Sequence, residues 1–296
     1  MNFLPVTLIG TMWMSSVLLA ALPYLFLSNG TLQEKIVGVA IAPVVFVLWF
    51  LFISGILSIP AQKAIIRGKF PREPNHPVYF WRKIYGCCWT TLYYFKPLYS
   101  VAISIPLLKK MTFRLFGYRG STNFTVYPDT WIRDLPLLDI GEKSYLSNRA
   151  TIGTNICLKD GTILVDQIKI GKNTMVGHLT MLAPGTRLED NVEVGVGSAI
   201  GIRCRLGENS KVGGTCTLNH GVVIGKNVEI GTSSFVGLKA EIADGIKLPP
   251  GSNIPGGAVI RTQAEVMRYF SSENLRIGSH LNDIGSLLSL GLENTS

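Results

Sequence analysis

The residues best suited to acid–base chemistry in this chain are histidines, of which there are four: His76, His178, His220 and His280. His178 and His220 each occupy the third position of a six-residue block, in VGHLTM and LNHGVV. An imidazole titrates near neutral pH, so it suits proton transfer to or from a reacting group. Asn219, beside His220, stands where most blocks have glycine. The candidate catalytic residues are therefore His220, His178 and Asn219, and the alternative is that these histidines are exposed without a chemical role.

A repeat of six residues positions these side chains and runs from Ile140 to Ile260. Nearly every block opens with Ile, Leu or Val, its second residue is usually Gly, and its fifth is small or β-branched. A fixed short period is typical of a solenoid, so we expect three short strands per coil with stacked coils. The opener and the fifth residue should point inward, and the glycine should lie at the bend with positive φ. A helix fits poorly, because a period of six does not match 3.6 residues per turn.

The pattern resembles the left-handed parallel β-helix of the hexapeptide-repeat acyltransferases over about 120 residues. The stretch LNHGVVIGKNVEIG resembles the segment that holds the general base in such enzymes. The resemblance implies that His220 takes a proton from an acceptor hydroxyl or amine as that group attacks the thioester of acyl-CoA or an acyl-carrier protein. Many relatives have Asp after this histidine, whereas this chain has Gly221. Asp160, Asp166 or a backbone carbonyl would then have to orient the ring.

The resemblance also implies where the donor binds. Acyl-CoA, with acetyl-CoA the commonest case, would lie along the coil corners near Gly231, Gly237 and Gly257. Arg261 would meet the CoA phosphates, and the alternative for Arg261 is a solvated surface charge. A homotrimer with its sites between subunits is implied as well. No metal is expected, because the zinc member of this fold, the γ-class carbonic anhydrase, needs three His ligands, and the position of one of them is Thr215 here.

Two apolar segments precede the repeat, at residues 3–28 and 36–59. Each is long enough to cross a bilayer, so together they predict a transmembrane hairpin. A signal peptide fits less well, because no positive charge precedes the first segment and the segment is too long. Basic residues follow the second segment, from Lys63 to Lys83. The positive-inside rule then favours a cytoplasmic β-helix domain, in a bacterial inner membrane.

A third apolar and aromatic stretch, residues 85–107, has basic residues on both sides. We expect interfacial helices here instead of another crossing. This stretch, followed by RLFGYRGSTN and DIGEKSYLSNRATIGTN, is similar to the carboxy-terminal membrane portion of the poly-lysine-type peptide synthetases. In residues 158–169 the second block positions are Lys159 and Val165 instead of Gly. This irregularity predicts a loop ejected between coils, and one more irregular coil is the alternative.

Composition narrows the partners. The formal net charge is +9, but Lys and Arg cluster between residues 63 and 119 beside the apolar segments. Membrane lipid is therefore the expected partner, and nucleic acid is not. The five cysteines lack a C-x-x-C spacing, and Cys204 and Cys216 occupy the inward fifth position, so we expect core thiols.

We expect four regions: a transmembrane hairpin at 1–60, juxtamembrane helices at 61–120, a left-handed β-helix at 121–262 and a helical cap at 263–296. Within the cap, residues 261–272 and the amphipathic segment 279–292 predict helices that cover the open end of the solenoid. The expected function is a membrane-bound acyltransferase that uses acyl-CoA and a membrane-associated acceptor, such as a lipid-linked sugar or polysaccharide precursor. The alternatives are a non-catalytic scaffold or regulatory membrane module, and a γ-class carbonic anhydrase-like zinc protein.

Overall fold

The computed structural model describes residues 3–269. The chain divides into two compact units. Of the described residues, the first contains 3–122, 133–138 and 157–165, and the second contains 123–132, 139–156 and 166–269. Most of the predicted cap, with the segment 279–292 and His280, lies outside the described residues.

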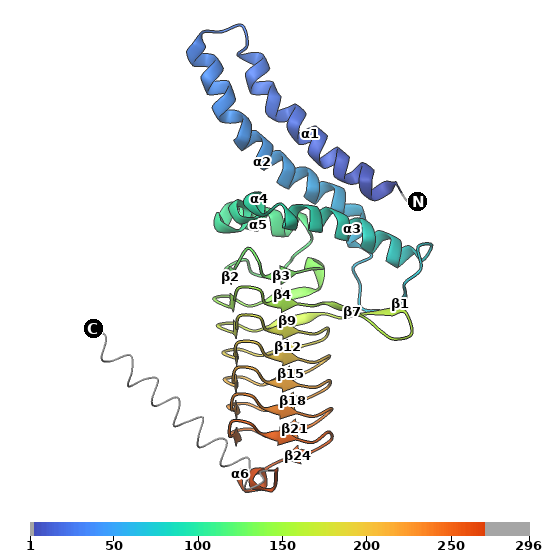
Figure 1. Ribbon diagram of the computed structural model, residues 1–296, viewed down its shortest axis with the longest axis vertical. Helices are drawn as coiled ribbons and strands as arrows, with labels where there is room; N and C mark the ends of the chain where they lie inside the picture. Colours follow the sequence, from blue (N-terminus) through green and yellow to red (C-terminus); the bar gives the residue numbers. More distant parts are fainter. Residues whose placement is uncertain (1–2, 270–296) are drawn as a thin grey trace, which may run out of the picture. The chain divides into compact units, whose positions relative to one another are not determined.

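Two long helices begin the first unit, and both predicted apolar segments are confirmed as helical: α1 (Leu4–Phe26) and α2 (Leu32–Gln62). A capping box starts α2, since the Glu34 carboxylate accepts from the Thr31 N–H at 2.6 Å. In the described part of the chain, these two are the helices long and apolar enough to cross a membrane. They run side by side as a hairpin (Figure 1).

Three shorter helices follow in the same unit: α3 (Pro77–Tyr94), α4 (Lys96–Ser104) and α5 (Pro106–Leu115). Each has a proline in its first turn, where the missing N–H costs nothing. Their aromatic side chains form a buried core around Trp89, whose ring meets those of Tyr99 and Phe116 edge-on. The predicted aromatic stretch is therefore helical, and its place at a membrane interface stays a prediction.

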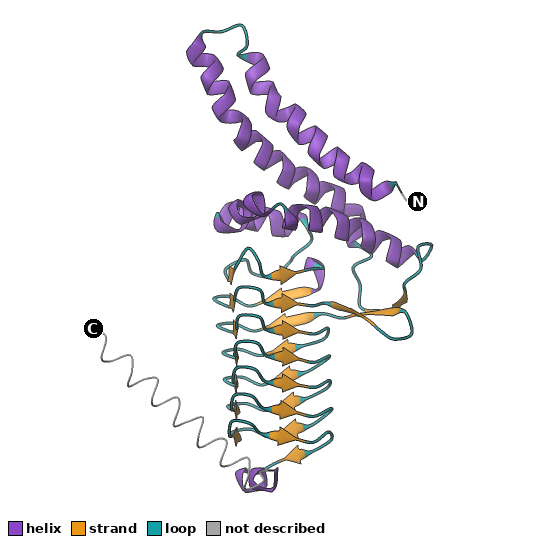
Figure 2. Ribbon diagram, viewed as in Figure 1, coloured by secondary structure: helices purple, strands orange, loops and turns teal. Residues whose placement is uncertain are grey.

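The second unit is a parallel β-solenoid of three seven-stranded sheets, as predicted for the fold (Figure 2). Sheet 1 is formed by β2 (Thr125–Val126), β5 (Tyr145–Leu146), β10 (Met175–Val176), β13 (Glu193–Val194), β16 (Lys211–Val212), β19 (Glu229–Ile230) and β22 (Lys247–Leu248). Sheet 2 is formed by β3 (Trp131–Ile132), β6 (Thr151–Ile152), β11 (Met181–Leu182), β14 (Ala199–Ile200), β17 (Thr217–Leu218), β20 (Phe235–Val236) and β23 (Asn253–Ile254). Sheet 3 is formed by β4 (Leu138–Ile140), β9 (Ile168–Ile170), β12 (Arg187–Leu188), β15 (Arg205–Leu206), β18 (Val223–Ile224), β21 (Glu241–Ile242) and β24 (Val259–Ile260).

The inward residues are the ones that the repeat predicts. The block openers, such as Ile152, Leu218 and Ile260, are fully or almost fully buried. The small fifth residues are buried too, and their hydroxyls have a shared task. Ser198 Oγ donates to the carbonyl fifteen residues on, in the next coil, at 2.9 Å and accepts the Cys216 N–H at 3.1 Å. A buried hydroxyl is thus satisfied on both sides, which explains why Ser and Thr recur there.

The predicted reason for the second-position glycines is wrong. None of them has positive φ; the left-handed conformation falls two residues later, at positions such as Asn173, Asn191 and Asn209. These glycines are needed because the next coil stacks directly on them. A Cβ on Gly207 would lie 2.5 Å from the backbone of Gly225, which no real contact allows. Close approach of two backbones, and not turn geometry, selects glycine here.

The predicted ejected segment is confirmed, with different limits. Strands β7 (Asn155–Cys157) and β8 (Thr162–Val165) leave the coil and pair with each other. The segment β1 (Gly68–Pro71) joins β8 antiparallel, so a three-stranded sheet stands apart from the solenoid sheets. Residues 168 and 169, which we expected in the loop, belong to β9 (Ile168–Ile170) of sheet 3. The short helices are η1 (Leu135–Leu137), α6 (Gln263–Val266) and η2 (Met267–Tyr269).

Candidate functional site

The candidate residues lie on the corners between the sheets. We call the turns that follow the strands of sheets 1, 2 and 3 the first, second and third corners. Equivalent corner residues recur every 18 residues, as the pairing of Met175 with Glu193 and of Glu193 with Lys211 shows. Successive coils are therefore about 4.8 Å apart at each corner.

His220 lies on the second corner, and its side chain is exposed. Its ring turns back toward the preceding coil, where Nδ1 accepts the backbone N–H of Ile202 at 3.0 Å. Gly201 makes this possible, because a Cβ there would lie 2.8 Å from Nδ1. Ile202 lies 18 residues, or one coil, before His220. The 18-residue period of the coils could therefore have predicted that these two residues are neighbours.

This hydrogen bond decides the tautomer of the imidazole. Because Nδ1 is the acceptor, the hydrogen of the neutral ring is on Nε2. In this state Nε2 is thus a hydrogen-bond donor. A general base needs a free lone pair instead, so the predicted role requires that Nδ1 release Ile202.

Neither of the two acids considered from the sequence orients this ring. Asp160 lies on the ejected hairpin and pairs with Lys69 at 2.5 Å. The hydrogen bond from Lys69 holds the pKa of that carboxyl well below its usual range. Asp166 pairs with Arg203 at 3.1 Å. The group that orients His220 is a backbone donor, and not the acid or the carbonyl that we expected.

Asn219 serves the backbone beside His220. Its side-chain oxygen accepts the His220 N–H at 2.7 Å, and its carbonyl accepts the Cys204 thiol at 2.9 Å. Burial raises the pKa of Cys204 to about 11, so the thiol is neutral at physiological pH. The prediction of a core thiol at Cys204 is confirmed by its complete burial.

His178 lies on the first corner and is half-buried. The same corner borders a groove of about 580 Å³. Gly214, two coils from His178, lines this groove, as does the predicted donor residue Gly231. Its remaining lining comes from sheet 1, the first corner and α6: Glu193, Gly195, Lys211, Val212, Gly213, Glu229, Ile230, Lys247, Leu248, Pro249, Pro250 and Gln263.

The groove has a charged wall that the sequence analysis missed. Lys211 pairs with Glu193 at 3.0 Å, and Lys247 pairs with Glu229 at 3.1 Å. Gln263 of α6 closes one end, since its amide donates to the Lys247 carbonyl and accepts the Lys247 N–H, both at 2.8 Å. Glu and Lys alternate at 18-residue intervals in the sequence, and this pattern could have predicted the charged wall.

The other predicted donor residues lie on different corners. Gly237 and Gly257 share the second corner with His220. Arg261 follows β24, at the third-corner position, with an exposed side chain and a backbone N–H that donates to Glu265 at 2.8 Å. Within one chain, the structure therefore groups His220 with Gly237 and Gly257, and His178 with Gly231.

Within residues 3–269, no group of three or more His, Cys, Asp or Glu side chains is arranged to hold a metal ion. Thr215 bonds instead to the Gly214 carbonyl and the Ser233 hydroxyl.

Comparison with known proteins adds a match to the repeat itself. Residues 203–237 match the family model described as bacterial transferase hexapeptide (six repeats). The matched segment runs from β15 to β20, within the solenoid. The match includes His220, Asn219, Gly231 and Gly237, and it begins one residue after Ile202.

The chain is also similar to a curated protein and to several solved structures. The Delta-poly-L-ornithine synthetase of Acinetobacter baumannii is 32% identical over 87 residues, which cover 29% of this chain and 6% of that protein. A GDP-perosamine N-acetyltransferase of Caulobacter crescentus, whose structure was solved with CoA and GDP-perosamine, is 14% identical to this chain, with a TM-score of 0.29. The match covers 52% of this chain and 60% of the acetyltransferase. The UDP-N-acetylglucosamine acyltransferase LpxA of Bacteroides fragilis is 18% identical, with a TM-score of 0.29, over 54% of this chain and 68% of that one.

Proposed function

We propose that this chain is a membrane-bound acyltransferase. It moves an acyl group, acetyl in the simplest case, from acyl-CoA to a membrane-associated acceptor such as a lipid-linked sugar or polysaccharide precursor. The observation that carries the proposal is an exposed imidazole, held by the Ile202 N–H, on a corner of a domain that matches the transferase hexapeptide repeat.

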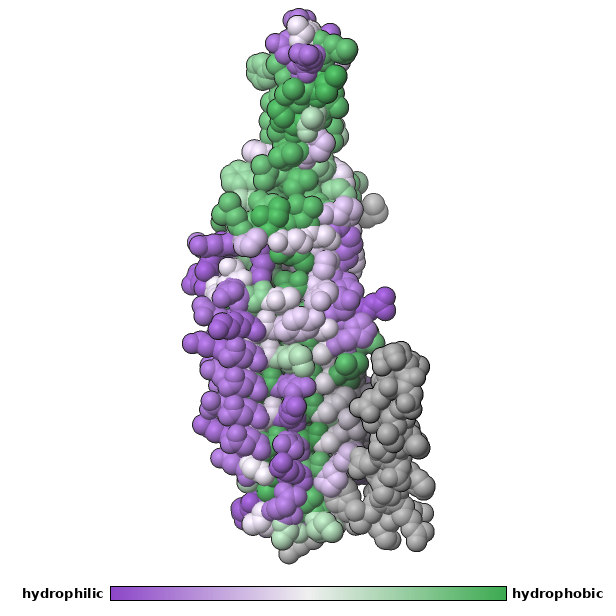
Figure 3. All heavy atoms as spheres, turned by 90° about the vertical axis from the view of Figure 1, so that its left-hand side faces the viewer, coloured by the Kyte–Doolittle hydropathy of each residue, from purple (hydrophilic) through white to green (hydrophobic). Residues whose placement is uncertain are grey.

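The helical hairpin supports the membrane part of this proposal. On the face seen in Figure 3 the hairpin is largely apolar below its hydrophilic tip, and side chains such as Val17, Leu18 and Leu25 are more than half exposed. A soluble core helix would bury such residues, whereas a bilayer covers them. The basic residues after α2 favour a cytoplasmic solenoid below a bacterial inner membrane.

The proposed reaction uses His220 at the acceptor. The acceptor oxygen or nitrogen attacks the thioester carbonyl carbon, the C–S bond breaks, and the acceptor proton passes through the imidazole to the departing CoA thiolate. Nε2 must then carry the lone pair, so substrate binding must free Nδ1 from Ile202. Catalytic hydrogen bonds often form only in the substrate complex, so this change belongs to the binding step.

We further propose a homotrimer, in which His220 of one copy meets the groove of its neighbour. The outward residues of sheet 2 support this arrangement, because they carry no charge from β11 onward: Met181, Ala199, Thr217, Phe235 and Asn253. Interface cores are depleted of charge, whereas sheet 1 presents the Glu and Lys row to solvent. The trimer would unite the two corners that a single chain keeps apart.

Acetyl-CoA itself tests the proposal. The full chain in nanodiscs should bind acetyl-CoA by titration calorimetry, and it should release free thiol when the nanodiscs contain bacterial total lipid extract. His220→Ala should abolish thiol release and retain acetyl-CoA binding. A folded wild-type chain that neither binds acetyl-CoA nor releases thiol would favour the non-catalytic scaffold.

A further inference from the structure

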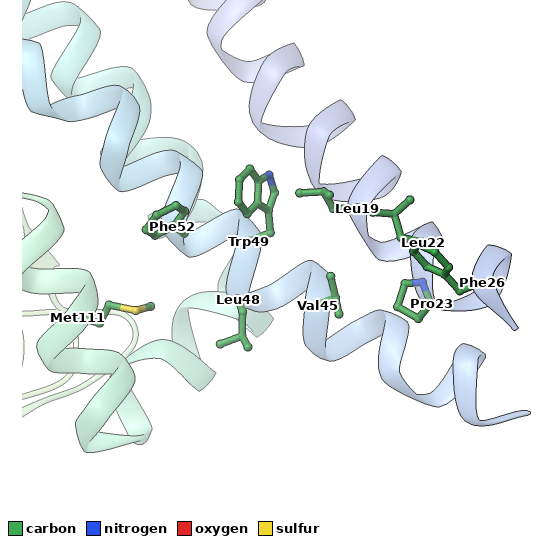
Figure 4. A pocket seen from close by; sticks show the side chains of 9 residues that line it. All are labelled: Leu19, Leu22, Pro23, Phe26, Val45, Leu48, Trp49, Phe52 and Met111. Carbon is green, nitrogen blue, oxygen red and sulfur yellow. The ribbon is translucent and has the colours of Figure 1, made fainter. Parts of the chain in front are cut away.

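An apolar groove opens on the hairpin, in the first unit (Figure 4). Its volume of about 670 Å³ lies within the range of ordinary small-ligand sites. The only polar side-chain atom among its lining residues is the Trp49 indole nitrogen, which donates to Ser15 Oγ at 3.2 Å. The groove is lined by Leu19, Leu22, Pro23, Phe26, Val45, Leu48, Trp49, Phe52 and Met111.

Two glycines of α2 bound this groove along the helix. A Cβ on Gly38 would lie 3.0 Å from the carbonyl of Pro23, so α1 packs closely there. A Cβ on Gly55 would lie 2.5 Å from Leu115, so α5 packs closely at that point. About 26 Å of helix separates the two glycines at 1.5 Å per residue. Between them, α2 presents a stripe at i, i+3, i+4 and i+7: Val45, Leu48, Trp49 and Phe52.

Helix α5 contributes Met111 to the groove and places positively charged side chains near it. Met111 belongs to α5, where Lys109 and Lys110 directly precede it. Lys110 is exposed. From residue 36 to residue 128 the chain has eleven Lys and Arg but a single acidic residue, Glu73. A negatively charged headgroup is therefore attracted to this part of the chain.

We propose that this groove holds one acyl chain of an anionic glycerophospholipid, whose phosphate lies against Lys110. The hydrocarbon chain fits a wall whose indole nitrogen already donates to Ser15, and the phosphate meets the cations of α5. A second copy of the chain is a poorer occupant, because it would bring the same excess of cations. The inference rests on the hairpin lying in a membrane and is independent of the acyl-transfer chemistry.

Native mass spectrometry tests this site. The full chain is taken into detergent from nanodiscs that contain equal amounts of phosphatidylglycerol and phosphatidylcholine with identical acyl chains. We expect about one phosphatidylglycerol to remain bound to each chain, in preference to phosphatidylcholine. Leu48→Trp, which fills the groove, should remove this lipid. Val39→Trp, at an exposed α2 residue outside the groove, should keep it.

A charge variant separates headgroup recognition from the fit of the chain. Lys110→Gln should lower the preference for phosphatidylglycerol about fivefold, while Lys35→Gln, at the opposite end of α2, should leave it unchanged. Equal retention of both lipids by the wild-type chain would overturn the proposal. Undiminished retention by Leu48→Trp would also overturn it, and so would an unchanged preference in Lys110→Gln.

Discussion

Substituting His220 with three different side chains separates catalysis from structure at the second corner. His220→Asn places an amide oxygen close to the position of Nδ1, so the hydrogen bond from the Ile202 N–H is kept while Nε2 is lost. His220→Ala removes both ring nitrogens, and His220→Gln keeps a donor near the position of Nε2. The three variants therefore differ in which of the two ring contacts survives.

The magnitudes follow from the observed contact. Loss of one exposed hydrogen bond at 3.0 Å in His220→Ala should reduce the free energy of unfolding by about 0.5–1.5 kcal/mol, with little change in His220→Asn. Loss of a general base should lower turnover by about 10² to 10⁴, which corresponds to roughly 2.7–5.4 kcal/mol of transition-state stabilisation. If His220 is the base, both variants lose turnover and only His220→Ala loses stability.

The assay pairs thiol release from acetyl-CoA with thermal unfolding of each variant in the same nanodiscs. If turnover follows stability, with His220→Asn as active as the wild type, then His220 is a structural residue and the proposed mechanism is refuted. If His220→Gln retains most of the turnover while His220→Asn does not, the imidazole acts as an Nε2–H donor and not as the base.

Three further predictions concern the framework. Gly207→Ala places a Cβ 2.5 Å from the next coil and should lower the free energy of unfolding, measured by chemical denaturation, by about 1–3 kcal/mol. Gly153→Ala places a Cβ 3.2 Å from a single carbonyl oxygen and should lower the free energy of unfolding by less. Equal losses in the two variants would contradict the stacking explanation. A maleimide at pH 7 should label the exposed Cys157 rapidly and should leave the buried Cys204 unmodified until the chain unfolds. Burial lowers the pKa of Lys109 to about 8 from 10.5, so between these pH values the folded state binds fewer protons than the unfolded state, and the free energy of unfolding should rise with pH. In lipid-free detergent, Lys109→Met should therefore raise the melting temperature at pH 7 but not at pH 10.5. An equal effect at both pH values would refute this reasoning.

Much of the solenoid could be predicted because a coil repeats one local rule. The block openers and fifth residues were assigned to the core from periodicity, and residues such as Ile152 and Ser198 are buried there. The ejected segment was visible as a failure of the same rule. The glycine explanation failed because periodicity reports only that a side chain is excluded. The excluding atoms belong to the next coil, 18 residues away.

The candidate site was only partly predictable for a related reason. His220 and Asn219 stood out by residue type, but the partner of the ring is a backbone N–H, which has no residue-specific signature. The groove beside Gly231 is built from the four coils that supply Glu193, Lys211, Glu229 and Lys247, so it exists only once those coils stack.

By itself, the sequence determined the period, the inward faces and the two apolar helices, because each of these depends on residues close together in the chain. The tertiary structure alone decided which nitrogen of His220 is occupied, which corner carries a groove, and where α1, α2 and α5 leave space between them. These features depend on contacts between residues that are distant in the sequence, and such contacts are fixed only when the backbones approach each other.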